Sequence, residues 1–288
     1  MRGQPKIVTV ILSTFCLSGL VRADNVAADI ARIHIEAIGG ETRVARLESF
    51  RAAGQSQVGE FVMEFQMWAS RPQSIRIEVN LQNKTLVQGW DGKGEPWIQN
   101  GQDGPAGVMP TALGARFKVE SAFDTPLFRP AERGFLLEYA GEDEVDGRPA
   151  VKILATRDLI DQSTLYLSAD TYFILRQDRT RRQDDGPALR VQTFYSDFRP
   201  VLGVIMPHRI AVKEGERIVS DVVLNWMEPN PPLDESDFRM PGAPVPPPTP
   251  AEEPTPSSDS EAPESSTDFD LGSLREVEEP ERVLELSK

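Results

Sequence analysis

The sequence predicts a mainly β fold with a few helices, of the α+β class, whose strands pair antiparallel with their neighbours. Apolar and polar residues alternate with a period of two over 61–68 and 75–82, which is typical of strands with one apolar face. Turn sequences such as Asp-Gly at 146–147 and Glu-Gly at 214–215 separate strand-like runs at short intervals. About ten or eleven strands are therefore expected to follow one another as an antiparallel meander.

A first helix is expected to begin near Asn25 and to end at the Gly39-Gly40 pair. Its apolar residues are spaced by four, three and four positions, which places them on one helical face: Val26, Ile30, Ile33 and Ala37. Glycine readily takes the left-handed conformation that ends a helix, so the pair supplies the stop. A second short turn is expected around Val44 and Leu47.

One interruption of the strand pattern lies in the middle of the chain. Glycines and a proline at 101–105 open a non-strand segment, and 111–123 is expected to form a helix. The apolar residues of this helix are Leu113, Phe117, Ala122 and Phe123. A helix that packs on the sheet as part of an ordinary core is one interpretation, and the alternative follows from the family resemblance described below.

The last strands are marked by 195–209 and 230–241. The first segment predicts a strand, a tight corner containing Pro200 and Gly203, and a returning strand; one more strand and a proline-stiffened exit follow. Together with the helix that ends at Gly39, these segments resemble the LolA-like family of outer-membrane lipoprotein-sorting proteins, over roughly 24–241. The resemblance implies a strongly curved antiparallel sheet that forms an incomplete, half-open β-barrel with a helical lid over an apolar concavity.

The resemblance implies a ligand-binding concavity, and the apolar positions of the two alternating strands and of the middle helix are the candidates to line it. They are Phe61, Met63, Phe65, Met67, Ile75, Ile77, Val79, Leu81, Leu113, Phe117 and Phe123. The same residues at the same spacing also suit a closed core, and only the resemblance favours a cavity. The lipoprotein carriers of the family latch their lid with an arginine, for which Arg43, Arg46 and Arg51 are the nearby candidates.

Chemical signatures point away from an enzyme. The only cysteine is Cys16, which lies in the segment expected to be removed, so thiol chemistry and thiolate metal sites are excluded from the mature chain. His34 and His208 show no metal-ligand spacing and no pairing with a nucleophile, so we expect structural roles for both. The sequence therefore predicts no catalytic residues, no metal and no cofactor.

The N-terminus predicts export. Basic Arg2 and Lys6 precede a mostly apolar stretch, and Val21 and Ala23 occupy the minus-three and minus-one positions of a cleavage site after Ala23, as in a cleavable signal peptide over 1–23. The apolar stretch is shorter than the roughly twenty residues that span a bilayer. We therefore expect a periplasmic protein without stable membrane insertion after cleavage.

Charge separates the C-terminal segment, 242–288, from the rest. Residues 241–288 contain twelve acidic residues and ten of the 24 prolines. The segment 242–288 is therefore expected to be a disordered acidic tail. Neither this tail nor the acidic domain before it suits nucleic acid, which needs a basic face. The one basic run, 176–182, is either a solvated hairpin arm, which is favoured, or an anion-binding site.

These observations together predict a periplasmic binding or carrier protein for a lipid or a lipid-modified protein, without chemistry. An apolar concavity holds acyl chains without specific polar groups, because each buried methylene contributes roughly 0.8 kcal/mol. The alternative is a protein-interaction or envelope-stress sensor module on the same fold.

Overall fold

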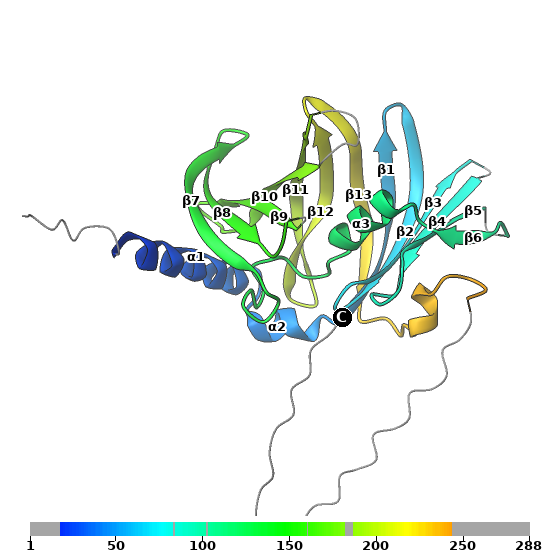
Figure 1. The fold of residues 1–288 in the computed structure, drawn as a ribbon, viewed down its shortest axis with the longest axis horizontal. Coiled ribbons are helices and arrows are strands. Elements are labelled where there is room, and N and C mark those ends of the chain that lie inside the picture. The colour runs from blue at the N-terminus through cyan, green and yellow to red at the C-terminus, as the bar shows by residue number, and fades with distance from the viewer. Residues whose placement is uncertain (1–17, 83, 102, 160, 182–186, 244–288) are drawn as a thin grey trace, which may run out of the picture. The chain divides into compact units, whose positions relative to one another are not determined.

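The computed structural model describes residues 18–243 except 83, 102, 160 and 182–186 (Figure 1). The predicted signal peptide and acidic tail therefore lie largely outside the described residues, and their predicted boundaries stay predictions. Within the described part of the chain, no helix is both long and apolar enough to cross a membrane.

The described residues form thirteen strands in a single antiparallel sheet. In chain order they are β1 (Ser49–Val58), β2 (Phe61–Ser70), β3 (Ser74–Leu81), β4 (Lys84–Trp90), β5 (Trp97–Asn100), β6 (Ala106–Val108), β7 (Leu136–Val145), β8 (Arg148–Thr156), β9 (Gln162–Ser168), β10 (Ile174–Arg181), β11 (Leu189–Val201), β12 (Val204–Glu214) and β13 (Arg217–Pro229). The order across the sheet is β6-β5-β4-β3-β2-β1-β13-β12-β11-β10-β9-β8-β7. The chain therefore starts in the middle of the sheet, runs outward to β6, crosses to β7 and returns, and the sheet stays open at both edges.

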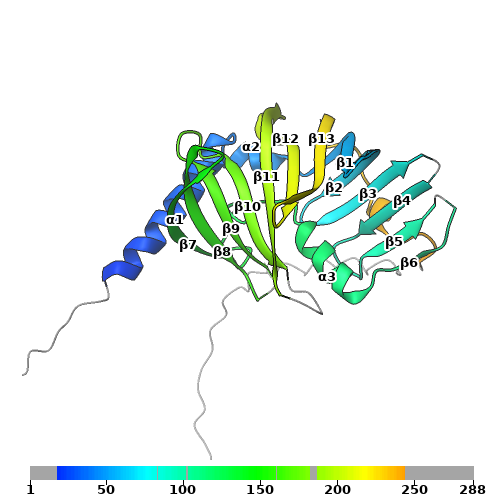
Figure 2. The same ribbon diagram turned by 90° about the horizontal axis from the view of Figure 1, so that it is seen from above.

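Three α-helices and one 3-10 helix accompany the sheet: α1 (Ser18–Ala37), α2 (Glu41–Arg46), α3 (Thr111–Glu120) and η1 (Glu235–Phe238). The helix predicted over 111–123 is thus confirmed, with its end three residues earlier. It belongs to the crossover from β6 to β7, and Figure 2 shows the sheet bent around it. We call the face on which α1 and α3 pack the inner face and the opposite one the outer face.

The end of α1 confirms the predicted glycine stop. Gly39 and Gly40 have φ angles of 134° and 87°, and the Gly40 N–H donates to the Ile35 carbonyl at 2.9 Å. The predicted apolar face of α1 is confirmed only in part: Ile30 is buried, but Val26 is 37% exposed, and Ile33 and Ala37 are half-buried. The buried face is shifted by one position and includes two alanines and a histidine: Ala27, Ile30, Ala31, His34, Ile35 and Ile38. The small alanines let α1 approach the sheet closely, which a search for large apolar residues overlooks.

The predicted ending of the sheet is confirmed with one difference. β11, β12 and β13 follow in the expected order, but Pro200 lies inside β11, paired with Ile205, and takes no part in the corner. Leu202 and Gly203, with φ angles of 50° and 78°, form the tight turn instead.

A closed core fills the inner face of β7–β9. Three residues of α1 and two of the crossover pack there against five residues of the strands. All ten are buried: Ala27, Ile30, Ala31, Leu127, Phe135, Leu137, Ile153, Ala155, Leu165 and Leu167. Helix α1 and the crossover thus cover the half of the sheet that contains β7–β9, and α3 covers the half that contains β2 and β3.

Candidate functional site: the inner face beneath α3

The apolar surface beneath α3 is built from β2 and β3. Their register pairs Phe65 with Val79 and Met67 with Ile77, so the predicted apolar positions point to the same face. Phe117 of α3 is buried in a cluster with Ile75 on this surface. The alternation read from the sequence is therefore confirmed, and it places α3 over the predicted residues.

Burial divides the predicted residues into three groups. Phe65, Ile75 and Phe117 are buried, and the contact of Ile75 with Phe117 holds α3 on the sheet. Half-buried side chains form the accessible part of the surface: Met63, Met67, Ile77, Val79 and Phe123. Phe61, at the β1–β2 turn, is 60% exposed and Leu113 is 36% exposed, so neither is enclosed; the side chain of Leu81 lies outside the described residues.

Neighbouring strands extend this surface with residues outside the predicted set. Phe50, Ala52 and Leu224 are buried beside Phe65. Partly buried apolar side chains complete the same cluster: Met67, Val79, Phe123, Met206, Val222 and Met227. The pairing of β1 with β13 brings the C-terminal members into place, and local sequence patterns do not reveal that pairing.

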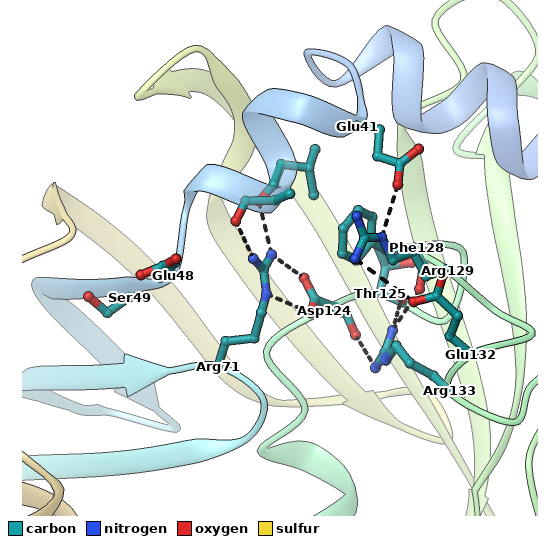
Figure 3. Close-up of polar contacts among 12 residues, drawn as sticks. Glu41, Glu48, Ser49, Arg71, Asp124, Thr125, Phe128, Arg129, Glu132 and Arg133 are labelled. Carbon is teal, nitrogen blue, oxygen red and sulfur yellow. Dashed lines mark hydrogen bonds and ion pairs between the residues drawn. The ribbon is translucent and has the colours of Figure 1, made fainter. Parts of the chain in front are cut away.

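Arg71, at the end of β2, fastens the segment after α3 to α2 (Figure 3). Its guanidinium forms a bidentate ion pair with Asp124, with N–O distances of 2.7 and 2.9 Å. The same group donates to the carbonyls of Val44 and Ala45 at 2.9 and 2.8 Å, which lie at the end of α2. Arg71 thereby binds two segments that flank the apolar surface.

The crossover around Asp124 is held by further arginines (Figure 3). Arg133 donates to the Thr125 and Asp124 carbonyls at 2.6 and 3.0 Å, and Arg129 binds Glu41 of α2 at 2.9 Å. The Arg133 bonds hold the crossover to itself, and the Arg129 ion pair fixes it to the first residue of α2.

The arginines suggested as a latch have other positions. Arg43 is exposed and donates to the Gly39 carbonyl at 2.8 Å. Arg51 lies on the outer face, with its guanidinium 5.3 Å from the Trp68 ring and 5.6 Å from the Trp226 ring. Arg71, which takes the bridging position, lies too far along the chain to be selected as nearby.

The basic run 176–182 is not a solvated arm where the structure describes it. The side chains of Arg176, Arg179 and Arg181 are 13%, 25% and 27% exposed. Arg176 lies 3.6 Å from the Tyr166 ring on the outer face, whereas Arg179 points to the inner face. The arginines of the run therefore lie on both faces of the sheet. Arg182 is outside the described residues.

Both histidines are buried. His34 Nδ1 lies 2.8 Å from the Tyr172 carbonyl, and burial lowers the pKa of His34 to about 4, so the ring is neutral at pH 7 and donates this bond. His208 Nδ1 lies 3.1 Å from the Met206 carbonyl. Among the described residues, no group of three or more His, Cys, Asp or Glu side chains is arranged to hold a metal ion.

A hollow of about 220 Å³ lies on the outer face, not beneath α3. Polar side chains line most of it, including Gln55, Glu64, Gln66 and Asn80. Such a lining does not suit an acyl chain, so the apolar surface of the inner face remains the candidate site.

Comparison with known structures shows a LolA-like fold. An outer membrane lipoprotein-sorting protein domain from Vibrio parahaemolyticus superposes with a TM-score of 0.53 and 10% sequence identity, covering 75% of this chain and 97% of that domain. A LolA superfamily protein from Nitrosomonas europaea gives a TM-score of 0.49 and 11% identity, covering 74% and 97% of the two chains. The sequence matches no family model and no curated protein. At such low identity the likeness shows the fold, and what the chain binds is a separate question.

Proposed function

We propose that this chain is a periplasmic carrier that holds a lipid or a lipid-modified protein on the inner face beneath α3, without chemistry. The observation that carries the proposal is the row of half-buried apolar side chains there, of which Met67, Ile77 and Val79 form the centre. In this proposal the open sheet acts as a half-open barrel and α3 as its lid.

The physical chemistry of the surface suits an acyl chain. Burial of each methylene contributes roughly 0.8 kcal/mol, so a chain needs no specific polar partner to be retained. Methionine is flexible and polarisable, and Met63, Met67 and Met206 can therefore adapt to chains of different shape. Arg71 supports the role of α3 as a lid, because it fixes the segment that follows α3 to α2.

The proposed location rests on cleavage after Ala23. Helix α1 spans this position, since it begins at Ser18 and ends at Ala37. A chain that begins at Asp24 keeps every buried residue of α1 from Ala27 onward. Removal of residues 1–23 therefore leaves the α1 residues of the closed core on β7–β9 in place.

The decisive experiment adds volume to the surface. Val79→Trp fills space that a ligand would occupy, so we expect it to reduce uptake of an apolar fluorophore at least tenfold, with a change in unfolding free energy below about 1 kcal/mol. Val62→Trp is the matched control, because Val62 lies on the outer face of β2 and is exposed. It should leave uptake unchanged.

The opposite result would identify a closed core. A filled site would be overpacked by Val79→Trp, which costs roughly 1–3 kcal/mol, and uptake would be the same in the variant as in the unaltered chain. A protein that takes up no fluorophore and carries no lipid when purified from envelope would instead favour the interaction module.

A further inference from the structure

The inner face changes from apolar to polar between α3 and α1. In β9 and β10, Leu165 belongs to the closed core and pairs with Gln177, so both face inward. Gln177 donates to the Ser163 hydroxyl at 3.1 Å and accepts from the Tyr195 hydroxyl at 3.1 Å. Arg179, two residues beyond Gln177, faces inward by the same alternation.

Three arginines meet at this polar stretch: Arg133, Arg157 and Arg179. The guanidinium groups of Arg133 and Arg157 lie 5.4 and 5.1 Å from the Phe135 ring. Asp161 lies between Arg157 and Arg179, with N–O distances of 2.8 Å and 4.0 Å. Two positive charges therefore flank one buried carboxylate, and Arg133 lies on the same phenylalanine ring as Arg157.

The other carboxylates near this stretch are already engaged. Asp124 forms its ion pair with Arg71, and Glu120 at the end of α3 pairs with Arg116 at 2.7 Å. Burial, together with the positive charges of Arg157 and Arg71, lowers the pKa of Arg133 despite the nearby Asp124 and Asp161. Asp158, beside Arg157, accepts from the Asp161 N–H at 2.8 Å. The three arginines thus gather positive charge at one place of an acidic protein, with Arg133 and Arg179 half-buried and Arg157 exposed.

Arg179 has an unused donor. Its Nε atom is buried and has no hydrogen-bond partner, and its guanidinium approaches Asp161 only to 4.0 Å. A buried donor without an acceptor costs free energy, and guanidinium geometry suits two oxygens of a phosphate or carboxylate. An oxyanion is therefore the acceptor that this group lacks.

The polar stretch continues directly into the apolar surface. The register connects Tyr195 to Ile210, Val222 and Ser56, and Ser56 to Met63, so these residues form one row across the inner face. With about 4.8 Å between neighbouring strands, the row from β11 to β2 spans roughly 19 Å. A fatty acyl chain can extend along a row of this length.

We propose that Arg133, Arg157 and Arg179 bind the oxyanion head group of an amphiphile, a phosphate or a carboxylate, whose acyl chain lies on the apolar surface beneath α3. This inference rests on the proposed carrier function. It adds a ligand class: anionic single-headed lipids are preferred over neutral ones with the same chain.

Three ligands that share one oleoyl chain test this preference: oleoyl lysophosphatidic acid, oleate and monooleoylglycerol. Each is titrated against a bound apolar fluorophore on the mature chain. We expect at least one anionic ligand to bind about tenfold more tightly than monooleoylglycerol, and the better one identifies the head group. Inorganic phosphate alone should not displace the fluorophore, because it has no chain.

Arg179→Gln should remove most of this preference while leaving the affinity for monooleoylglycerol unchanged. Arg179→Lys keeps the charge without the planar fork and should retain an intermediate preference. Arg148→Gln is the control, because Arg148 is exposed and lies at the opposite end of β8 from Arg157. Thermal midpoints of all variants show whether the fold is kept.

Equal affinity for the three ligands, or an unchanged preference in both Arg179 variants, would overturn the head-group site and leave the carrier function standing. Displacement by inorganic phosphate alone would assign the arginines to free anions and also overturn it. Absence of binding by any of the three ligands would contradict both proposals.

Discussion

The two halves of the inner face begin from the same strand pattern and reach different packing. Beneath α1, Ile153 and Leu167 have no exposed surface. Beneath α3, the corresponding apolar positions Met67, Ile77 and Val79 stay half-buried. The comparison teaches that the helix above the sheet, and not the alternation within the strands, decides whether an apolar face becomes a closed core.

The covering segments explain the difference. Helix α1 approaches closely through Ala27 and Ala31, and the crossover adds Leu127 and Phe135 to the same core. Helix α3 has ten residues, of which only Gly114 and Phe117 are buried. A short helix with so little buried surface covers the sheet incompletely.

The largest effect is expected where the packing is closed. Ile153→Ala should lower the free energy of unfolding by about 4 kcal/mol, because it leaves a cavity among fully buried neighbours. Ile77→Ala removes the same atoms from a half-buried position and should cost about 1 kcal/mol while weakening fluorophore uptake. Chemical denaturation measures both. Equal losses for the two variants would show that the halves are packed alike.

A smaller effect concerns the attachment of α1. His34 has a pKa of about 4 in the folded state because burial disfavours its charged form, against about 6.5 in the unfolded chain. The unfolded state therefore binds more protons between these values, and stability should fall by roughly 3 kcal/mol as pH drops from 6.5 to 4. His34→Gln should remove this contribution to the slope. An identical pH profile for the variant would contradict the assignment.

The effect expected at the junction between the halves is smaller than those of Ile153→Ala and of the His34 titration. Arg71→Met leaves Asp124 without its ion pair and frees the carbonyls at the end of α2, which should cost about 2 kcal/mol. Hydrogen exchange should become faster in α2 and in residues 121–128. Arg43→Met is the control, because Arg43 is exposed and donates a single bond to Gly39. Similar exchange in both variants would show that Arg71 does not fasten the two segments.

Local patterns account for most of what the sequence predicts correctly. The strands over 61–68 and 75–82, the glycine stop after α1 and the helix over 111–123 each depend on residues close together in the chain. On α1 the spacing of large apolar residues predicts the buried Ile30 correctly and misses the two alanines and the histidine that complete the buried face.

The polar parts of the site could not be predicted in this way. Arg71 reaches Asp124 across 53 positions and Ala45 across 26, and no local spacing signals either contact. Arg176 and Arg179 stand in one basic run, yet the alternation of β10 turns them to opposite faces. Only the assembled sheet separates the arginine that faces the candidate site from its neighbour.

The pairing of β1 with β13 has a consequence for how the protein is made. The first and last strands of the domain are neighbours in the middle of the sheet, so a chain emerging N-terminus first cannot complete the sheet until its C-terminal strand arrives. Until then both β1 and β12 present unpaired edges, and contacts so distant in sequence form slowly. A chain in which β13 has not yet paired is therefore an aggregation-prone folding intermediate.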